Sequence, residues 1–209
     1  MSSGQPLSSR FSIALFLPIV CLMAPACATD TAETPDMHVV IANELNRSAE
    51  AGHATANDLQ KVAAAGNAAA QYRLGLLYHD GQGVPQSYEQ AKHWFTKAAE
   101  QGHAGAQVNL GTIYLLGHGF YQSDPLALFW FRKAAEQKDA LACAKLGLMY
   151  ARGQGVSRDV IQAQMWYTLA VANGGWNIAE ARNALATQMT PAQIAEAQKL
   201  AQEWKPKSK

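Results

Sequence analysis

Cysteine is scarce in this chain of 209 residues, which contains three: Cys21, Cys27 and Cys143. Small exported domains that rely on disulfides have many paired cysteines, so we expect this fold to be stabilised by its apolar core instead. An excess of charge of one sign is also missing, since 17 basic residues face 16 acidic ones. Proteins that attract nucleic acid through their electrostatic field carry a basic excess. We therefore expect no nucleic-acid partner.

Long apolar runs are missing as well. The main run extends from Phe11 to Met23 and is interrupted by Pro18, whereas a membrane-spanning helix needs roughly 20 apolar residues. Arg10 precedes the run and small residues follow it, which is the order of a secretory signal. The sequence thus predicts a signal peptide at residues 1–28 and no membrane span.

The end of this signal leaves two localisations open. Ala24-Pro25-Ala26-Cys27 is also a loose version of a bacterial lipoprotein signal, which would place a lipid on Cys27. It departs from that pattern at Ala24 and Pro25, because the pattern usually has Leu three residues before the Cys. We expect an exported protein, in the bacterial periplasm or secreted, with an outer-membrane lipoprotein as the alternative.

The chain is rich in self-similarity. A Leu-Gly pair recurs at a step of 36 residues, beginning at Leu74, Leu110 and Leu146. The same step relates Ala70, Ala106 and Ala142; Tyr78, Tyr114 and Tyr150; Trp94, Trp130 and Trp166; and Ala98, Ala134 and Ala170. Repetition at this period is typical of a solenoid.

Each repeated unit has the pattern of a helical hairpin. Its first half carries apolar residues at helical spacing and ends at a Gly-x-Gly turn, and its second half shows the same spacing again. The sequence therefore predicts an all-α fold, a right-handed α-solenoid of stacked antiparallel helical hairpins. The expected segments after the signal are a linker at 29–36, N-terminal capping helices at 37–66, full repeats at 67–102, 103–138 and 139–174, C-terminal capping helices at 175–205, and a basic tail at 206–209.

The repeated motifs are Ala-x-x-x-Leu-Gly-x-x-Tyr, Gly-x-Gly-Val and Ala-x-x-Trp-[Phe/Tyr]-x-x-Ala. They resemble the Sel-one-like repeat family, a branch of the tetratricopeptide-like solenoids, from about Asp58 to Trp204. The chain departs from the pattern at Phe120-Tyr121, which replaces Val-Pro, and at Lys138, which replaces Gly. The resemblance implies an adaptor or scaffold for protein complexes. We expect a noncatalytic, monomeric protein without a cofactor.

A surface for such a partner follows from helix geometry. If Leu74 points at the second helix of its own unit, steps of 100° place other residues on the opposite side. Stacking would join these positions into one apolar strip that holds a peptide or helix of a partner protein in a concave groove. This predicted strip comprises Ala69, Tyr72, Leu76, His79, Gly105, Val108, Thr112, Leu115, Leu141, Ala144, Leu148 and Ala151, flanked by Arg73, Asp80, Asn109, Lys145 and Arg152. In the alternative, curvature closes the groove and these residues only pack against neighbouring helices.

Other conspicuous residues have a structural and a functional interpretation. Tyr121 stands where the other turns have Pro or Ser, which makes it a second candidate contact. The repeated tryptophans favour packing between units over ligand stacking. Cys143 occupies the position of Gln71 and Gln107, which favours a small buried side chain over a reactive thiol. The six histidines show no metal-ligand spacing, so we expect no metal site.

Two other function classes remain open. Cysteine-rich relatives of these repeats have been linked to penicillin binding and β-lactam hydrolysis, which implies a cell-envelope hydrolase or penicillin-interacting enzyme as an alternative. The Ser-x-x-Lys spacing of a penicillin-reactive serine does not occur in this sequence. The other alternative is a secreted host-interaction factor that acts on another organism's cells.

Overall fold

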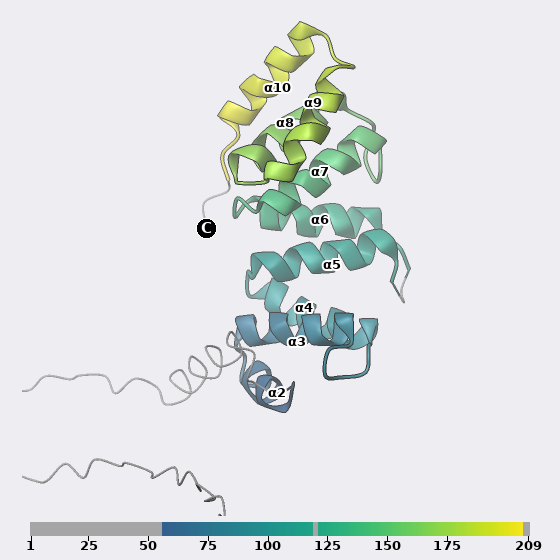
Figure 1. The fold of residues 1–209 in the computed structure, drawn as a ribbon, viewed down its shortest axis with the longest axis vertical. Coiled ribbons are helices and arrows are strands. Elements are labelled where there is room, and N and C mark those ends of the chain that lie inside the picture. Colours follow the sequence, from purple (N-terminus) through teal and green to yellow (C-terminus); the bar gives the residue numbers. More distant parts are fainter. Residues whose placement is uncertain (1–55, 119–120, 207–209) are drawn as a thin grey trace, which may run out of the picture. The chain divides into compact units, whose positions relative to one another are not determined.

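The computed structural model describes residues 56–118 and 121–206. The predicted signal peptide, Cys27, the linker, residues 37–55, Phe120 and the last three residues lie outside the described residues. The elements that are described are all helical (Figure 1). They are α2 (Ala56–Ala64), α3 (Ala68–Asp80), α4 (Tyr88–Glu100), α5 (Ala104–Leu116), α6 (Asp124–Ala135), α7 (Ala140–Arg152), α8 (Val160–Ala172), the 3-10 helix η1 (Trp176–Ile178), α9 (Ala179–Ala186) and α10 (Pro191–Glu203).

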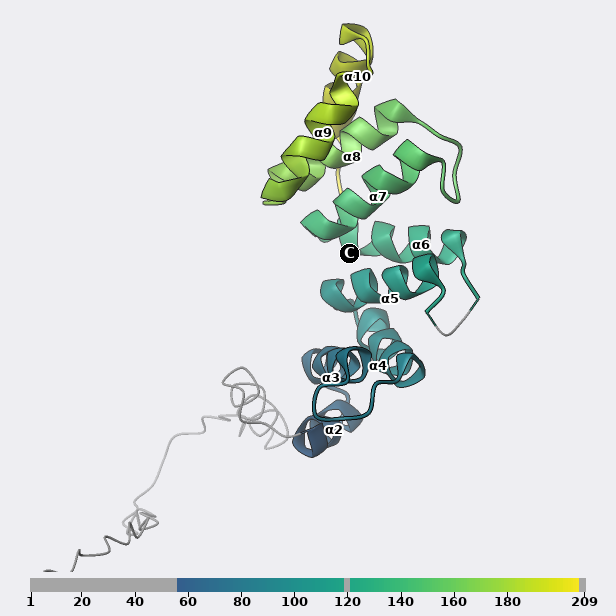
Figure 2. The same ribbon diagram turned by 45° about the vertical axis from the view of Figure 1, so that its right-hand side comes forward.

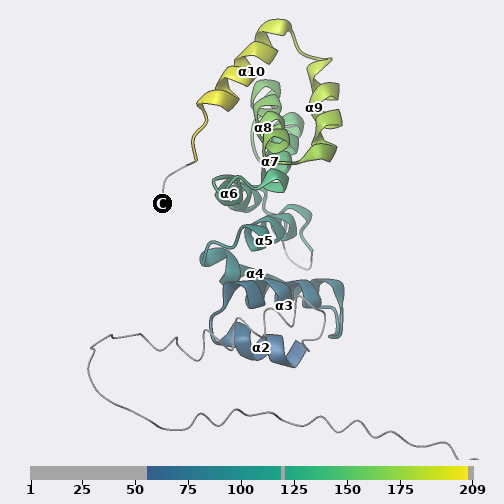
Figure 3. The ribbon, with the colours of Figure 1, turned by 60° about the vertical axis from the view of Figure 1, so that its left-hand side comes forward.

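The helices pack in the order in which the chain visits them. α3–α4, α5–α6 and α7–α8 form three hairpins, and each hairpin contacts the next through its second helix (Figure 2). Helix α2 packs on α3 at one end of the stack. At the other end α8 contacts both α9 and α10, which lie on opposite sides of it (Figure 3). This arrangement is an all-α solenoid of stacked hairpins.

Each first helix of a hairpin begins at a residue that caps it. Asn67, His103 and Asp139 have extended backbones, and their side chains accept a hydrogen bond from the N–H three residues on, at 2.9, 3.2 and 2.8 Å. Such bonds satisfy an N–H that has no partner within the helix. Three different residue types thus perform one task at one position of the repeat.

The turns that end the units explain one departure from the repeat pattern. Gly66, Gly102 and Gly174 follow the second helices with φ between 90° and 99°. Lys138 stands at the same position of the middle unit and adopts φ 63°, as the only non-glycine residue with positive φ among the described residues. A side chain in this region costs roughly 1 kcal/mol, so the middle unit keeps the turn at a small cost in stability.

The Leu-Gly pairs have a packing reason that the sequence pattern did not reveal. A Cβ atom added at Gly75, Gly111 or Gly147 would lie 2.6, 2.7 and 2.6 Å from the ring of the aromatic residue on the paired helix. These rings belong to Phe95, Phe131 and Tyr167, which are buried. Glycine therefore allows the aromatic ring to lie directly on the backbone of the facing helix.

The repeated tryptophans contact the preceding unit. Trp94 of α4 is buried in one cluster with Leu59 and Val62 of α2, and Trp166 of α8 is buried in a cluster with residues of α6. Trp130 packs in the corresponding way against the cluster that contains α4 residues, and it is half-buried. The structure thus supports packing between units as the role of these side chains.

Candidate partner-binding surface

In the first unit the predicted strip is half-buried and partly engaged in internal contacts. The Tyr72 ring stacks on His103 with ring centroids 4.4 Å apart. His79 places Nδ1 2.6 Å from Oδ1 of Asp80 and meets the edge of the Tyr88 ring. Ala69 and Leu76 are half-buried beside them. This part of the strip therefore exposes some apolar surface, and its Tyr72 and His79 side chains are held by internal contacts.

In the middle unit the strip is closed. Val108 and Leu115 are buried and share a core cluster with residues of α7, which packs next in the stack. Thr112 is half-buried, and its hydroxyl donates to the carbonyl of Val108 at 2.9 Å. Gly105 faces the Tyr72 ring. The prediction that Val108 and Leu115 line an open groove is therefore wrong, because neighbouring helices cover them as the packing alternative expects.

In the third unit the strip opens onto an apolar hollow. Leu141 is 53% exposed, whereas Leu148 and Ala151 are half-buried. Ala144 is buried, so its side chain belongs to the core and adds little surface. The hollow has a volume of about 240 Å³ and is lined by Leu141, Ala144, Lys145, Leu148, Tyr167, Ile178 and Ala181. The last two come from η1 and α9, which extend the surface beyond the repeats.

The polar residues beside the strip differ in their surroundings. Asp80 is paired with His79, Arg73 makes internal interactions, and Asn109 is half-buried. Lys145 lines the hollow itself, and Arg152 is exposed. Burial raises the pKa of Tyr167, and the nearby Arg152 charge lowers it in part. Of the described residues that line the hollow, none is a carboxylate, so its charge is positive.

A buried polar ladder links successive units next to the strip. The Gln71 side chain donates to the carbonyl of Ala63 at 3.0 Å and accepts from Gln101 at 2.7 Å. Gln107 repeats both bonds, to Ala99 at 3.1 Å and from Gln137 at 2.9 Å. Each glutamine thereby satisfies a carbonyl at the end of the preceding unit's helix. Sequence reasoning recorded the repeat of these glutamines but not their function.

Cys143 takes the ladder position in the third unit. It is fully buried, and the Asn173 amide lies 3.8 Å from its sulfur. Burial raises the pKa of this thiol to about 11. Because the thiolate is the reactive form, the geometry supports a packing role for Cys143.

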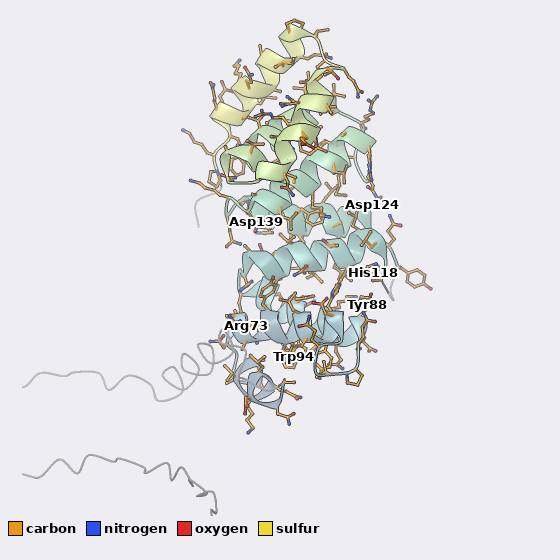
Figure 4. The ribbon with its side chains drawn as sticks, viewed as in Figure 1. Arg73, Tyr88, Trp94, His118, Asp124 and Asp139 are labelled. Carbon is orange, nitrogen blue, oxygen red and sulfur yellow. The ribbon has the colours of Figure 1, made fainter. Side chains whose placement is uncertain are left out.

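The described histidines have separate structural surroundings. His103 is the cap of α5, and burial lowers its pKa. The ring of His118 lies 4.9 Å from that of Tyr88, with both at the turn side of the stack (Figure 4). His93 packs against the ring of Trp94. Within the described residues no three potential ligands gather where a metal ion would be held.

Exposed large apolar side chains gather in the middle unit. Leu116 and Tyr121 are exposed around the α5–α6 turn, the latter by 97%, and Leu126 and Phe129 are exposed on α6. Sequence reasoning singled out Tyr121 alone. The α6 pair was detectable, because polar Gln90 and His93 occupy these two positions in the first unit.

Among the described helices, none has the length and apolar character of a membrane span.

Comparison with known proteins identifies the repeats. A model of the Sel1 repeat matches residues 68–103, 104–139 and 140–175. Among solved structures, a Sel1 repeat protein from Oxalobacter formigenes is 34% identical with a TM-score of 0.59, over 66% of this chain and 56% of that one. A protective antigen of uropathogenic Escherichia coli with an SLR fold is 30% identical with a TM-score of 0.52, over 79% of this chain and 45% of that one.

The chain thus spans about half the length of these two structures. Comparison with curated proteins gives no match. The matched segments coincide with the three hairpins, in which the repeated glycine, tryptophan and capping positions have repeated structural roles. The chain therefore belongs to the Sel1 repeat family, whose members typically serve as noncatalytic scaffolds and mediate protein–protein interactions.

Proposed function

We propose that this protein is an exported, noncatalytic scaffold that holds a peptide or helix of a partner protein against its predicted strip. The contact centres on the hollow between α7, α8 and α9. The observation that carries this proposal is the exposed Leu141 beside an apolar cavity of about 240 Å³. An apolar hollow with a few charged groups at its edge is the usual form of a peptide-binding surface.

The lining favours a particular kind of segment. Leu148, Tyr167 and Ile178 provide an apolar floor, on which one large apolar side chain of the partner would be removed from water. Lys145 in the lining and Arg152 nearby favour an acidic residue next to that side chain. The half-buried Leu76 and Tyr72 form a separate part of the strip in the first unit, because the strip is closed at Val108 and Leu115 between them and the hollow.

A charged substitution in the strip tests this proposal. The double variant Leu76→Glu and Leu148→Glu places carboxylates on the apolar surface, and we expect partner capture to fall at least about tenfold. Capture is measured by crosslinking in the native cells followed by purification of the tagged chain. The matched control, Gln90→Glu and Gln202→Glu, adds the same charge at exposed positions on α4 and α10.

Circular dichroism distinguishes loss of binding from loss of fold. Because Leu76 and Leu148 are half-buried, the single variant Leu141→Glu at the exposed position serves as a second test. We expect it to weaken capture while the melting temperature changes little. Equal capture by wild type, Leu141→Glu and the double variant would reject the strip as the binding surface.

Export and lipidation form a separate part of the proposal. The apolar run from Phe11 to Met23, preceded by Arg10, supports removal of a signal peptide. Cell fractionation and the intact mass of the purified chain test it. A mature chain that begins near Thr29 supports simple secretion, a chain that begins at a heavier Cys27 supports a lipid anchor, and an unprocessed cytoplasmic chain contradicts export.

A further inference from the structure

The outer side of α6 has an apolar face that the described chain leaves uncovered. Phe129 is 49% and Leu126 is 43% exposed, next to the half-buried Trp130. Phe129 stands between two hollows, one of about 370 Å³ towards α4 and α5 and one of about 520 Å³ towards the Gly155–Val156 turn. Leu126, Phe129 and Trp130 are referred to below as the α6 face.

Two of these three positions are buried one unit later. A step of 36 residues takes Phe129 to Met165 and Trp130 to Trp166 on α8, and it takes Leu126 to the half-buried Gln162. Met165 is only 4% exposed, and it lies in the core cluster against which Leu200, Ala201 and Trp204 of the α10 segment pack. Helix α10 contacts α8 along this side, opposite to α9 (Figure 3). In the third unit, a helix with apolar residues on one side thus packs on the surface that corresponds to the α6 face.

An aromatic side chain anchors that cover. The Trp204 ring meets the Trp166 ring edge-on, with centroids 5.7 Å apart. At the corresponding place in the middle unit, Phe129 and Trp130 line the hollow of about 370 Å³ together with polar and charged residues, among them Gln107, Lys133 and Glu136. This hollow has the volume to accept one large aromatic side chain together with part of the helix that carries it.

We propose that the α6 face binds an amphipathic helix of a partner protein, in the way that α8 binds α10 of its own chain. The helix presents apolar residues at a spacing of three and four, with one large aromatic residue that enters the hollow beside Trp130. Lys133, whose ammonium group lies 6.0 Å from the Phe129 ring centroid, lines this hollow together with Glu100 and Glu136, so the flank of that helix would meet charges of both signs. This surface is separate from the strip on α3, α5 and α7.

The first unit supplies the control for this face. Its equivalents of Leu126 and Phe129 are Gln90 and His93, which are exposed on α4. The variant Leu126→Gln with Phe129→His thus gives α6 the surface that α4 already carries in the folded protein. Since both replaced side chains are largely exposed, we expect the fold to remain and only docking to be lost.

Photo-crosslinking in the full-length chain tests the proposal. A benzophenone amino acid replaces Phe129 in one variant and His93 in a control variant, and both are irradiated in the native cells. We expect an adduct from position 129 at about ten times the yield from position 93, and about tenfold less adduct when Leu126→Gln is added. Mass spectrometry of the crosslinked peptide then identifies the segment that was bound.

Each result decides the question. An adduct on a segment with a helical apolar stripe and an aromatic residue supports the proposal, provided that Leu126→Gln weakens it. An adduct on a second copy of this chain, on lipid, or on a segment without such a stripe overturns it, as does a yield equal to that of position 93. Because capture through the strip is tested by Leu141→Glu, failure of one surface leaves the other unaffected.

Discussion

Helices α6 and α8 occupy the same place in successive units. The outer side of α6 is exposed, whereas the outer side of α8 is covered by α10. Their inner sides are alike, since Phe131 and Tyr167 each lie on the glycine of the paired helix. Their outer sides differ. Phe129 is exposed, whereas Met165 is buried in the core cluster against which residues of the α10 segment pack. The comparison teaches that the repeat specifies the interior, whereas the outward positions are free to acquire separate partners.

The strongest way to break this comparison is to remove an inner and an outer aromatic residue from the same helix. Phe131→Ala leaves a cavity in the core, and we expect it to lower the free energy of unfolding by about 3–5 kcal/mol. Phe129→Ala should lower it by less than about 1 kcal/mol, because the ring is half exposed. Urea unfolding followed by circular dichroism measures both. Similar losses for the two variants would contradict the division of α6 into a core side and a docking side.

A second variant tests the contact between glycine and ring. Gly111→Ala would gain about 1 kcal/mol of helix propensity, but its Cβ would lie 2.7 Å from the Phe131 ring. Overpacking costs about 1–3 kcal/mol, so after the gain in propensity we expect a net loss of up to about 2 kcal/mol. Gly105→Ala on the same helix is the control, since its Cβ would lie 3.1 Å from the half-buried Tyr72 ring, and it should lose less stability than Gly111→Ala. A stabilised Gly111→Ala protein would show that the ring contact is loose.

Weakening the contact between α10 and α8 tests the same comparison on the covered helix. Trp204→Ala removes the ring that meets Trp166, and we expect a loss of about 1–2 kcal/mol because Trp204 is only partly buried. Faster amide hydrogen exchange in α10, with α3 to α6 unchanged, is the expected pattern. Uniformly faster exchange in every unit would mean that α10 stabilises the whole stack and is not a local cover.

The smallest expected effect concerns the capping position. Burial lowers the pKa of His103, so the folded state favours the neutral imidazole whose Nδ1 accepts from Ala106. The His103 contribution is complete above the unfolded pKa of about 6.5 and is lost as the pH falls through the lower folded value. His103→Asn keeps the cap with the residue found at Asn67. Its stability should therefore fall less than that of the wild type on acidification, and an unchanged difference between the two would contradict this role.

The fold could be predicted from the sequence because the same pattern recurs three times at a step of 36 residues, which outweighs the ambiguity of any single segment. The Leu-Gly pairs, the tryptophans and the Gly-x-Gly turns each predict the same hairpin, and the structure confirms an all-α solenoid. The even spacing also located Lys138 as a departure, which the structure keeps in the left-handed region that glycine occupies in the other units. Such features depend on residues close in sequence or on an identical neighbour one unit away.

The predicted strip was less accessible, because exposure depends on which helix lies above each position. Gly105 and Leu141 occupy equivalent positions of the repeat, but Gly105 lies against the Tyr72 ring whereas Leu141 is 53% exposed. Leu141 borders a hollow that η1 and α9 help to line, and these two helices follow the last repeat. The exposure of the α6 face could not be predicted for a related reason, since a repeat pattern alone does not show whether another segment covers the helix.

Crosslinking from the hollow tests the central claim most directly. A benzophenone amino acid at Leu141, in the intact chain and its native cells, is compared with the same group at the exposed Gln90. We predict a dominant protein adduct from position 141 that disappears when Leu148→Glu is added. Equal background labelling from both positions, or an adduct that persists in the Leu148→Glu variant, would contradict the view that this hollow binds the partner.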